Sequence, residues 1–205
     1  MKHSTDRILT THCGSLARPK ELLALMKAKV SGEPCDLDEY KRQVRSAVAA
    51  IVRRQAECGV DVVTDGEQAK PGFFTYIRER LTGFETKSPP PGGWQQWAAE
   101  FAAFPEYYQE YSSRRMMGAG VLPRAPLVCT GPISYRGQEA IRADIDNLKA
   151  ALAGVDVAET FMPAVAPSGV GKNEYYRSEE EYLAAVSDAV REEYRAIVDA
   201  GFILQ

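Results

Sequence analysis

Two acidic residues in the segment Asp65-Gly66-Glu67 have the chemistry to bind or activate a substrate. They directly follow a predicted strand at residues 60–64, and the carboxyl ends of parallel strands are where α/β proteins build their sites. Glu67 is the strongest single candidate, because a carboxylate there can bind an ammonium group through charge-assisted hydrogen bonds. Asp65 is a candidate catalytic group. A salt bridge from Glu67 to a neighbouring cation such as Lys70 is the structural alternative.

A second polar group follows a predicted strand at residues 7–11. His12 is a candidate catalytic residue, because a histidine titrates at about pH 7 and can act as donor or base. Gly14 and Ser15 could offer backbone and hydroxyl contacts to a substrate, and Arg18 could pair with an anionic group. The alternatives are a purely structural histidine, a turn with a helix cap, and a surface arginine.

The four cysteines form no recognisable metal motif. Cys13, Cys35, Cys58 and Cys129 are widely separated and include no CxxC pair, so reduced thiols are expected. Cys13 directly follows His12, and adjacent side chains of an extended strand point to opposite faces, so the two cannot readily bind one metal. We expect Cys13 to be a small packing residue and Cys129 to lie in the core.

The composition excludes several classes of protein. The 205 residues carry a net charge of −3, with 45% hydrophobic and 26% charged residues, as in an ordinary globular protein. There is no basic block, which argues against nucleic acid or an anionic membrane as the main partner. No apolar run approaches the roughly 20 residues of a membrane span, and residues 1–11 hold no apolar stretch long enough for a signal peptide. We expect a cytoplasmic protein that acts on small molecules.

Short strands and amphipathic helices must position these residues. Strands are expected at residues 7–11, 60–64, 126–130, 157–165 and 202–205. Helices are expected at residues 19–29, 37–58, 72–81, 138–153 and 178–200. Asp36 and Ser178 are suited to cap two of the helices, because their side chains can accept bonds from free backbone N–H groups. Strands that alternate with helices indicate βαβ units and a parallel sheet.

Residues 84–125 interrupt this pattern and are expected to form an insertion with some helix. The segment is rich in aromatic residues: Trp94, Trp97, Phe101, Phe104, Tyr107, Tyr108 and Tyr111. These rings could form a lid that stacks on a flat ligand. Their helical spacing also fits burial against the main domain.

The predicted fold class is α/β, of the (β/α)8 TIM-barrel type. Polar motifs at the ends of successive strands favour a barrel, and the glycine-rich phosphate motif of a doubly wound sheet is missing. Residues 1–205 would form one partial domain with only the first four to five β/α units, because a full barrel needs roughly 250 residues. The last strand would leave an open edge. We therefore expect part of a longer polypeptide, or self-association through that edge.

The motifs resemble the catalytic barrel of cobalamin-independent methionine synthase and its short relatives. Thr10–Pro19 is similar to the family's opening strand, and Gly59–Glu67 is similar to its second-strand motif. Glu174–Tyr182 looks like the approach to the family's fourth helix, and Ala196–Gln205 looks like the segment that enters the fifth strand. The resemblance covers the amino-terminal half of that barrel.

This resemblance implies a zinc-dependent methyltransferase that moves a methyl group from a folate to a thiol such as homocysteine. Zinc would bind the thiol and lower its pKa. The resemblance places Glu67 against the amino group of the thiol substrate, with Gly14 and Ser15 against its carboxylate. The family's zinc ligands come from the second half of the barrel, so we expect them beyond residue 205. We expect no cofactor bound by this stretch alone, which would be inactive.

Two alternatives remain open. Asp65 stands where the synthases usually carry histidine, whereas His12 is common among the short relatives. These differences fit a related alkyl transferase that acts on another thiol, of the epoxyalkane:coenzyme M transferase type. The other alternative is a non-catalytic half-barrel that serves as a binding or assembly module. Stoichiometric zinc in the full-length chain would favour an enzyme over the module.

Overall fold

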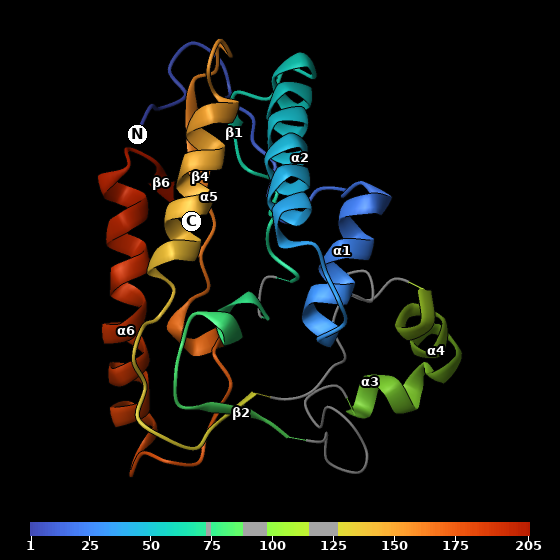
Figure 1. The fold of residues 1–205 in the computed structure, drawn as a ribbon, viewed down its shortest axis with the longest axis vertical. Helices are drawn as coiled ribbons and strands as arrows, with labels where there is room; N and C mark the ends of the chain where they lie inside the picture. Colours follow the sequence, from blue (N-terminus) through green and yellow to red (C-terminus); the bar gives the residue numbers. More distant parts are fainter. Residues whose placement is uncertain (73–74, 88–97, 115–126) are drawn as a thin grey trace.

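Helices and short strands alternate along the chain in the computed structural model, which describes residues 1–72, 75–87, 98–114 and 127–205 (Figure 1). The helices are α1 (Lys20–Ser31), α2 (Leu37–Glu57), α3 (Ala98–Ala103), α4 (Pro105–Arg114), α5 (Gln138–Ala151) and α6 (Glu179–Asp199). The strands are β1 (Val62–Val63), β2 (Phe84–Thr86), β3 (Leu127–Cys129), β4 (Glu159–Met162), β5 (Lys172–Asn173) and β6 (Ile203–Leu204). Two short 3-10 helices are η1 (Tyr76–Glu79) and η3 (Pro167–Gly169).

The first sheet is parallel and has the strand order β1-β4-β6. The segment expected as a strand at residues 7–11 lies beside β1, but only Thr11 forms a bridge, to Val62. The carboxylate of Asp61 holds this segment in place, because it accepts a hydrogen bond from the backbone N–H of Thr10 at 2.8 Å and pairs with the Arg7 guanidinium. A mixed α/β fold with parallel strands is therefore confirmed.

The strand expected at residues 126–130 is present but does not join that sheet. β3 pairs antiparallel with β2 and parallel with β5, whereas β4 pairs directly with β1. The turn before β2 explains part of this arrangement. Gly83 has a φ of +81°, and a Cβ there would lie 2.6 Å from the carbonyl oxygens of Gly131 and Pro132. The expectation that residues 126–130 form the third strand of one parallel repeat is wrong.

The two longest helices begin at the predicted caps. The carboxylate of Asp36 accepts hydrogen bonds from the N–H groups of Asp38 and Glu39, both at 3.0 Å. The hydroxyl of Ser178 accepts one from the N–H of Glu181 at 3.1 Å. Local sequence thus determines where α2 and α6 begin.

The helix expected at residues 72–81 is reduced to η1, which spans a single turn. The backbone N–H groups of Thr75 and Tyr76 both donate to the carbonyl of Gly72, at 3.0 Å, so the chain turns there. Tyr76 and Ile77 are buried by this turn. Residues 73–74 lie outside the described residues.

The hydrophobic core has two parts. Helix α5 contacts both α2 and α6 (Figure 1). The first part lies where α2 and α5 meet β1 and β4, and includes Val52, Leu148 and Met162. The second lies between η1, β3 and α6, and includes Ile77 and Val186. Both parts lie beside the loops that follow β1 and β4, so they support those loops.

Burial was expected for two cysteines, and the structure confirms it for one of them. Cys129 is buried, as expected. Cys13 is exposed, so its expected role as a packing residue is wrong. The chain turns at Gly14, which has a φ of +95°, and the Cys13 thiol accepts a hydrogen bond from the Gln205 amide at 3.6 Å.

Part of the expected insertion at residues 84–125 is helical. Helices α3 and α4 stand beside the rest of the molecule in Figure 1, and the ring of Phe101 stacks on Tyr108 with centroids 4.3 Å apart. Phe104 and Tyr107 are exposed, so these two rings are not buried against the main domain. Residues 88–97 and 115–126, which include both tryptophans, lie outside the described residues.

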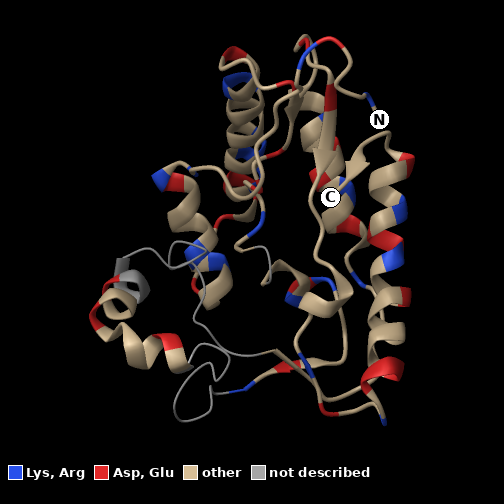
Figure 2. Ribbon diagram, turned by 180° about the vertical axis from the view of Figure 1, so that it is seen from behind, with Lys and Arg blue, Asp and Glu red and all other residues tan. Residues whose placement is uncertain are grey.

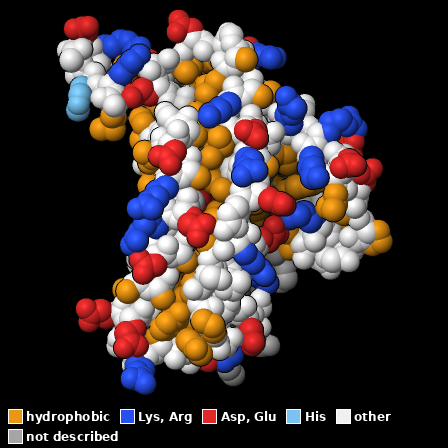
Figure 3. Space-filling model, turned by 60° about the vertical axis from the view of Figure 1, so that its left-hand side comes forward, with side chains coloured by type: hydrophobic (Ala, Val, Ile, Leu, Met, Phe, Trp, Pro, Cys, Tyr) orange, Lys and Arg blue, Asp and Glu red, His pale blue; other side chains and the backbone are white. Residues whose placement is uncertain are grey.

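Charged side chains of both signs are interspersed along α2 and α6 (Figure 2). Hydrophobic side chains show between charged ones on the face that includes α6 (Figure 3). Among the helices of the described ranges, none combines the length and hydropathy needed to cross a membrane.

Removal of the Asp36 cap should lower the stability of the protein only slightly. Asp36→Ala leaves two N–H groups of α2 without their partner, and the free energy of unfolding should fall by about 1 kcal/mol. Asp146→Ala, at an exposed position of α5, is the control and should change it by less than about 0.5 kcal/mol. Urea unfolding measures both. Equal values for the two variants would contradict the assigned cap.

Candidate functional site

The hydroxyl of Ser15 donates a hydrogen bond to the carboxylate of Glu67. The two residues are 52 positions apart in sequence, and each lies just beyond the carboxyl end of its strand segment. A backbone bond from the N–H of Leu16 to the carbonyl of Gly66, at 3.0 Å, fixes the two loops against each other. Ser15 is exposed and Glu67 is only 5% exposed. A buried carboxylate is therefore held by an exposed serine.

The loop that carries Glu67 has an unusual backbone. Glu67 has a φ of +56°. Within the described ranges it is the one residue other than glycine with a positive φ. Such a conformation costs about 1–3 kcal/mol, and strained residues of this kind cluster at functional sites. The carboxylate of Asp65 stabilises it by accepting a bond from the N–H of Glu67 at 2.9 Å. The structure thus shows Asp65 orienting Glu67.

Arg18 clamps the same loop through its backbone. Its Nη2 donates to the carbonyl oxygens of Glu67 and Lys70 at 2.7 and 2.6 Å. Burial lowers the pKa of the Arg18 guanidinium, and the nearby Glu67 carboxylate opposes that shift. Arg18 is half-buried, so it is not the freely solvated surface arginine of the structural alternative.

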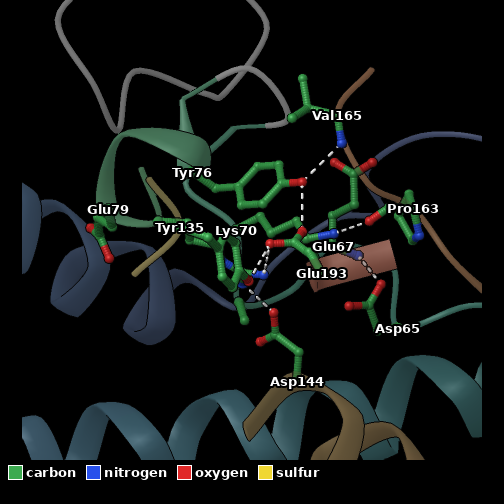
Figure 4. Close-up of polar contacts among 12 residues, drawn as sticks. Asp65, Glu67, Lys70, Tyr76, Glu79, Tyr135, Asp144, Pro163, Val165 and Glu193 are labelled. Carbon is green, nitrogen blue, oxygen red and sulfur yellow. Dashed lines mark hydrogen bonds and ion pairs between the residues drawn. The ribbon is translucent and has the colours of Figure 1, made fainter. Parts of the chain in front are cut away.

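Lys70 does not form the ion pair that the structural alternative requires. Its Nζ donates to the carbonyl of Pro163 and lies 4.8 Å from the centroid of the Tyr76 ring (Figure 4). Lys70 is 3% exposed. Within the described ranges no ion pair joins a cation to the carboxylate of Asp65 or Glu67. The proposed salt bridge between Glu67 and Lys70 is therefore wrong.

His12 lies between the first strand segment and Ser15 but joins neither carboxylate. In the parts of the chain that the structure describes, no hydrogen bond links it to Asp65 or Glu67, and its buried Nε2 has no partner. The structure brings Ser15, Asp65 and Glu67 together and leaves His12 beside them.

A buried ionic network lies next to this site, and sequence reasoning missed it. The Arg80 guanidinium pairs with Asp144 of α5, and its Nη1 lies 2.9 Å from the carboxylate of Glu193 on α6. All three side chains are almost completely buried. Burial raises the pKa of Glu193, but Arg80 and a hydrogen bond from Tyr135 lower it by more, so the net shift is downward. Glu193 therefore remains an anion.

Two tyrosines extend this network toward the site (Figure 4). The hydroxyl of Tyr76 donates to Glu193 at 2.9 Å and accepts a bond from the N–H of Val165 at 2.8 Å. The hydroxyl of Tyr135 donates to the other oxygen of Glu193 at 2.7 Å. Burial raises the pKa of both phenols. The loop after β1 is thereby tied to the segment after β4.

The sequence contains a signal for this network. Glu193 lies on the apolar face of its helix, between Val190 and Ile197, and Asp144 lies between Ile141 and Ile145. A carboxylate in an apolar stripe needs a buried partner, because an unpaired buried charge is costly.

The residues that the structure describes do not fit a zinc ion. They contain no group of three or more histidine, cysteine, aspartate or glutamate side chains arranged to hold a metal. Cys13 is exposed, and its thiol contacts the Gln205 amide. No catalytic step through zinc is derived from these residues.

Comparisons with known proteins point to one group, the cobalamin-independent methionine synthases. Residues 8–94 match the family model for the catalytic domain of cobalamin-independent synthases. The chain is 26% identical to a methionine synthase of Saccharolobus solfataricus over 193 residues, and 25% identical to that of Sulfolobus acidocaldarius over 192. Each alignment covers 94% of this chain, but only 49% and 48% of those relatives. The chain spans about half the length of the curated relatives it matches.

The fold also has solved counterparts. A B12-independent methionine synthase from Shewanella sp. W3-18-1, solved in complex with selenomethionine, superposes with a TM-score of 0.64 at 19% identity. The match covers 96% of this chain and 50% of that protein. The resemblance predicted from the sequence motifs is confirmed.

Proposed function

We propose that this chain, a relative of the cobalamin-independent methionine synthases, binds the ammonium group of an amino-acid thiol through Glu67. One observation carries the proposal: the Glu67 carboxylate is buried, accepts a hydrogen bond from Ser15, and has no ion-pair partner within the described ranges. Asp65 holds the backbone of the same residue. A buried carboxylate without an ion-pair partner favours a cationic ligand, because a charge-assisted hydrogen bond then compensates its desolvation.

The other residues of the site would hold the rest of that ligand. Gly14 turns the backbone beside Ser15. The backbone N–H groups of Gly14 and Ser15 would contact the ligand carboxylate, because the Ser15 hydroxyl already donates its one hydrogen to Glu67. Arg18 would hold the loop through its Nη2, which donates to two backbone carbonyls, and its buried Nε has no hydrogen-bond partner within the described ranges. His12 and Asp65 are the candidates for moving or holding a proton. The Shewanella protein was solved with selenomethionine, which is also an α-amino acid.

The activity that we infer is methyl transfer to a thiol such as homocysteine. Zinc, where present, would bind the thiol and lower its pKa, so that a thiolate forms near neutral pH. Because the described residues do not fit a zinc ion, we propose that its ligands come from outside residues 1–205, and that these residues alone are inactive. The thiol acceptor and the methyl donor would then be bound by residues 1–205 together with the part of the protein that carries the zinc ligands.

We further propose that residues 1–205 form the amino-terminal half of a (β/α)8 barrel. The parallel order β1-β4-β6, with residues 8–11 beside β1, supports this proposal. These segments would be neighbouring barrel strands, and residues 84–125 would be an insertion between them. Among the described residues, β6 pairs with β4 on one of its sides. A second half of the same barrel or another copy of the chain would cover its other side.

The direct test is Glu67→Gln, which keeps the shape of the side chain and removes its charge. We expect binding of homocysteine to weaken by about 1.5–3 kcal/mol, the contribution of one charged hydrogen bond. Isothermal titration calorimetry on the full-length protein measures this change.

Two controls make that result specific. Glu139→Gln, at an exposed position of α5, should leave the affinity unchanged. The thiol 4-mercaptobutyrate lacks the amino group, so Glu67→Gln should not weaken its binding. Unchanged homocysteine affinity in Glu67→Gln would remove Glu67 from the site.

A further inference from the structure

A pocket of about 340 Å³ lies between the carboxyl end of α1, η1 and the second sheet. It is separate from Ser15 and Glu67, although Pro71 links its wall to the loop that carries Glu67. Four apolar side chains form part of its wall: Val30, Pro71, Phe84 and Leu127.

The charged residues that line this pocket are mostly basic. Lys29, Arg78 and Arg136 face a single carboxylate, that of Glu79. Glu79 already pairs with Lys29, at 2.7 Å. The two arginines therefore leave a surplus of positive charge in a protein whose net charge is −3.

Neither arginine has a carboxylate partner within the ranges that the structure describes. Nη2 of Arg78 donates to the hydroxyl of Thr86 at 2.7 Å, and Nη2 of Arg136 donates to the carbonyl of Arg78 at 2.9 Å. A guanidinium has five N–H donors, so most of them remain available on each side chain. The bond from Arg136 to the backbone of Arg78 also keeps the two residues together.

The residues outside the described ranges bring no negative charge of their own. Residues 73–74, 88–97 and 115–126 contain neither aspartate nor glutamate. Glu85 is next in sequence to Phe84 and Thr86, which line the pocket, so on a strand its side chain points to the opposite face. An anionic ligand would supply the counter-charge that Arg78 and Arg136 lack within the described ranges.

We propose that this pocket binds an organic anion, in which a phosphate or carboxylate group is joined to an apolar body. The two guanidinium groups match the planar arrangement of acceptor oxygens in either group. The apolar wall formed by Val30, Pro71, Phe84 and Leu127 contacts the body of the ligand. This inference does not depend on the function proposed for Glu67.

The test uses three probes at low ionic strength, titrated into the protein by calorimetry. Phenyl phosphate and benzoate carry the two kinds of anionic group on a flat apolar ring, and inorganic phosphate lacks the ring. We expect saturable binding of at least one aromatic probe, and weaker binding of inorganic phosphate. Tighter binding of phenyl phosphate assigns the site to phosphates, and tighter binding of benzoate assigns it to carboxylates.

Charge-removing variants complete the test. Arg78→Gln and Arg136→Gln should each weaken the bound probe by about tenfold or more. Arg136→Lys keeps the charge but loses the planar fork, so its affinity should fall between those of the wild type and Arg136→Gln. Arg142→Gln, at an exposed position of α5, should leave binding unchanged.

The proposal is overturned if no probe binds saturably, or if Arg142→Gln weakens binding as much as Arg136→Gln does. Arg136 is exposed, so its variants should fold even if Arg78→Gln does not. Circular dichroism of each variant checks this point.

Discussion

Arg80→Leu is expected to lower the free energy of unfolding by about 3–5 kcal/mol, because it leaves buried carboxylates without their cation. Arg80 pairs with both Asp144 and Glu193, and all three side chains are almost completely buried. Two uncompensated carboxylates would remain between α5 and α6. This loss is a large part of the roughly 5–15 kcal/mol that stabilises a typical domain.

Urea unfolding followed by far-ultraviolet circular dichroism measures this loss. The matched control is Arg191→Leu, which breaks an exposed pair with Asp188 on α6. An exposed pair contributes about 0–1 kcal/mol, so the control should unfold nearly as the wild type does. If the two variants lost similar free energy, Arg80 would not be the counter-ion of a buried network.

The triple variant Arg80→Met, Asp144→Leu, Glu193→Met separates charge from packing. Replacing a whole buried ionic group by apolar residues of similar size is often neutral for stability. We therefore expect the triple variant to be more stable than Arg80→Leu alone.

The helices were predictable because their signals are local. The cap at Asp36 and the spacing of Val44, Val48 and Val52 lie within one helix, and α2 begins and ends within one residue of the prediction. The same holds for α6, which begins one residue after Ser178. Neither helix needs information from elsewhere in the chain to set its ends.

Strand partners could not be predicted in the same way. Residues 126–130 have the composition of a parallel core strand, yet β3 pairs with β2 and β5. The choice depends on distant contacts, such as the approach of Gly83 to Gly131 and Pro132. The sequence of a strand alone does not determine which other strand it pairs with.

The candidate site was predictable in part. The motifs after two strands identified Ser15 and Glu67, which are in contact. The buried network was not predicted, because Arg80, Asp144 and Glu193 lie on three separate elements. Its members come together only when η1 packs against α5 and α6.

The network also carries the second large effect that we predict. Tyr76→Phe keeps the ring over which Lys70 lies and removes only the hydroxyl. That hydroxyl is bonded to Glu193 and to the N–H of Val165. Each of the two lost bonds leaves a buried polar group with one partner fewer, at about 1–3 kcal/mol, so the free energy of unfolding should fall by roughly 2–6 kcal/mol.

Substitutions of two other tyrosines give smaller expected losses of stability, and urea unfolding can compare them with that of Tyr76→Phe. Tyr135→Phe removes one bond to Glu193 and none to the backbone, so it should cost less than Tyr76→Phe. Tyr175→Phe, at an exposed position, should cost less than about 0.5 kcal/mol. A Tyr76→Phe variant as stable as Tyr175→Phe would show that its hydroxyl does not tie η1 to the backbone at Val165.

The same variant tests whether the network supports the site. Tyr76 holds Val165 and Lys70 holds Pro163, so both fix the segment after β4 against the loop that carries Glu67. With Tyr76→Phe, this segment loses one of two attachments, and homocysteine affinity should fall even where the protein remains fully folded. Tyr135→Phe leaves both attachments in place and should keep the affinity. If Tyr76→Phe lost stability but bound homocysteine normally, the network would stabilise the fold without positioning the loop.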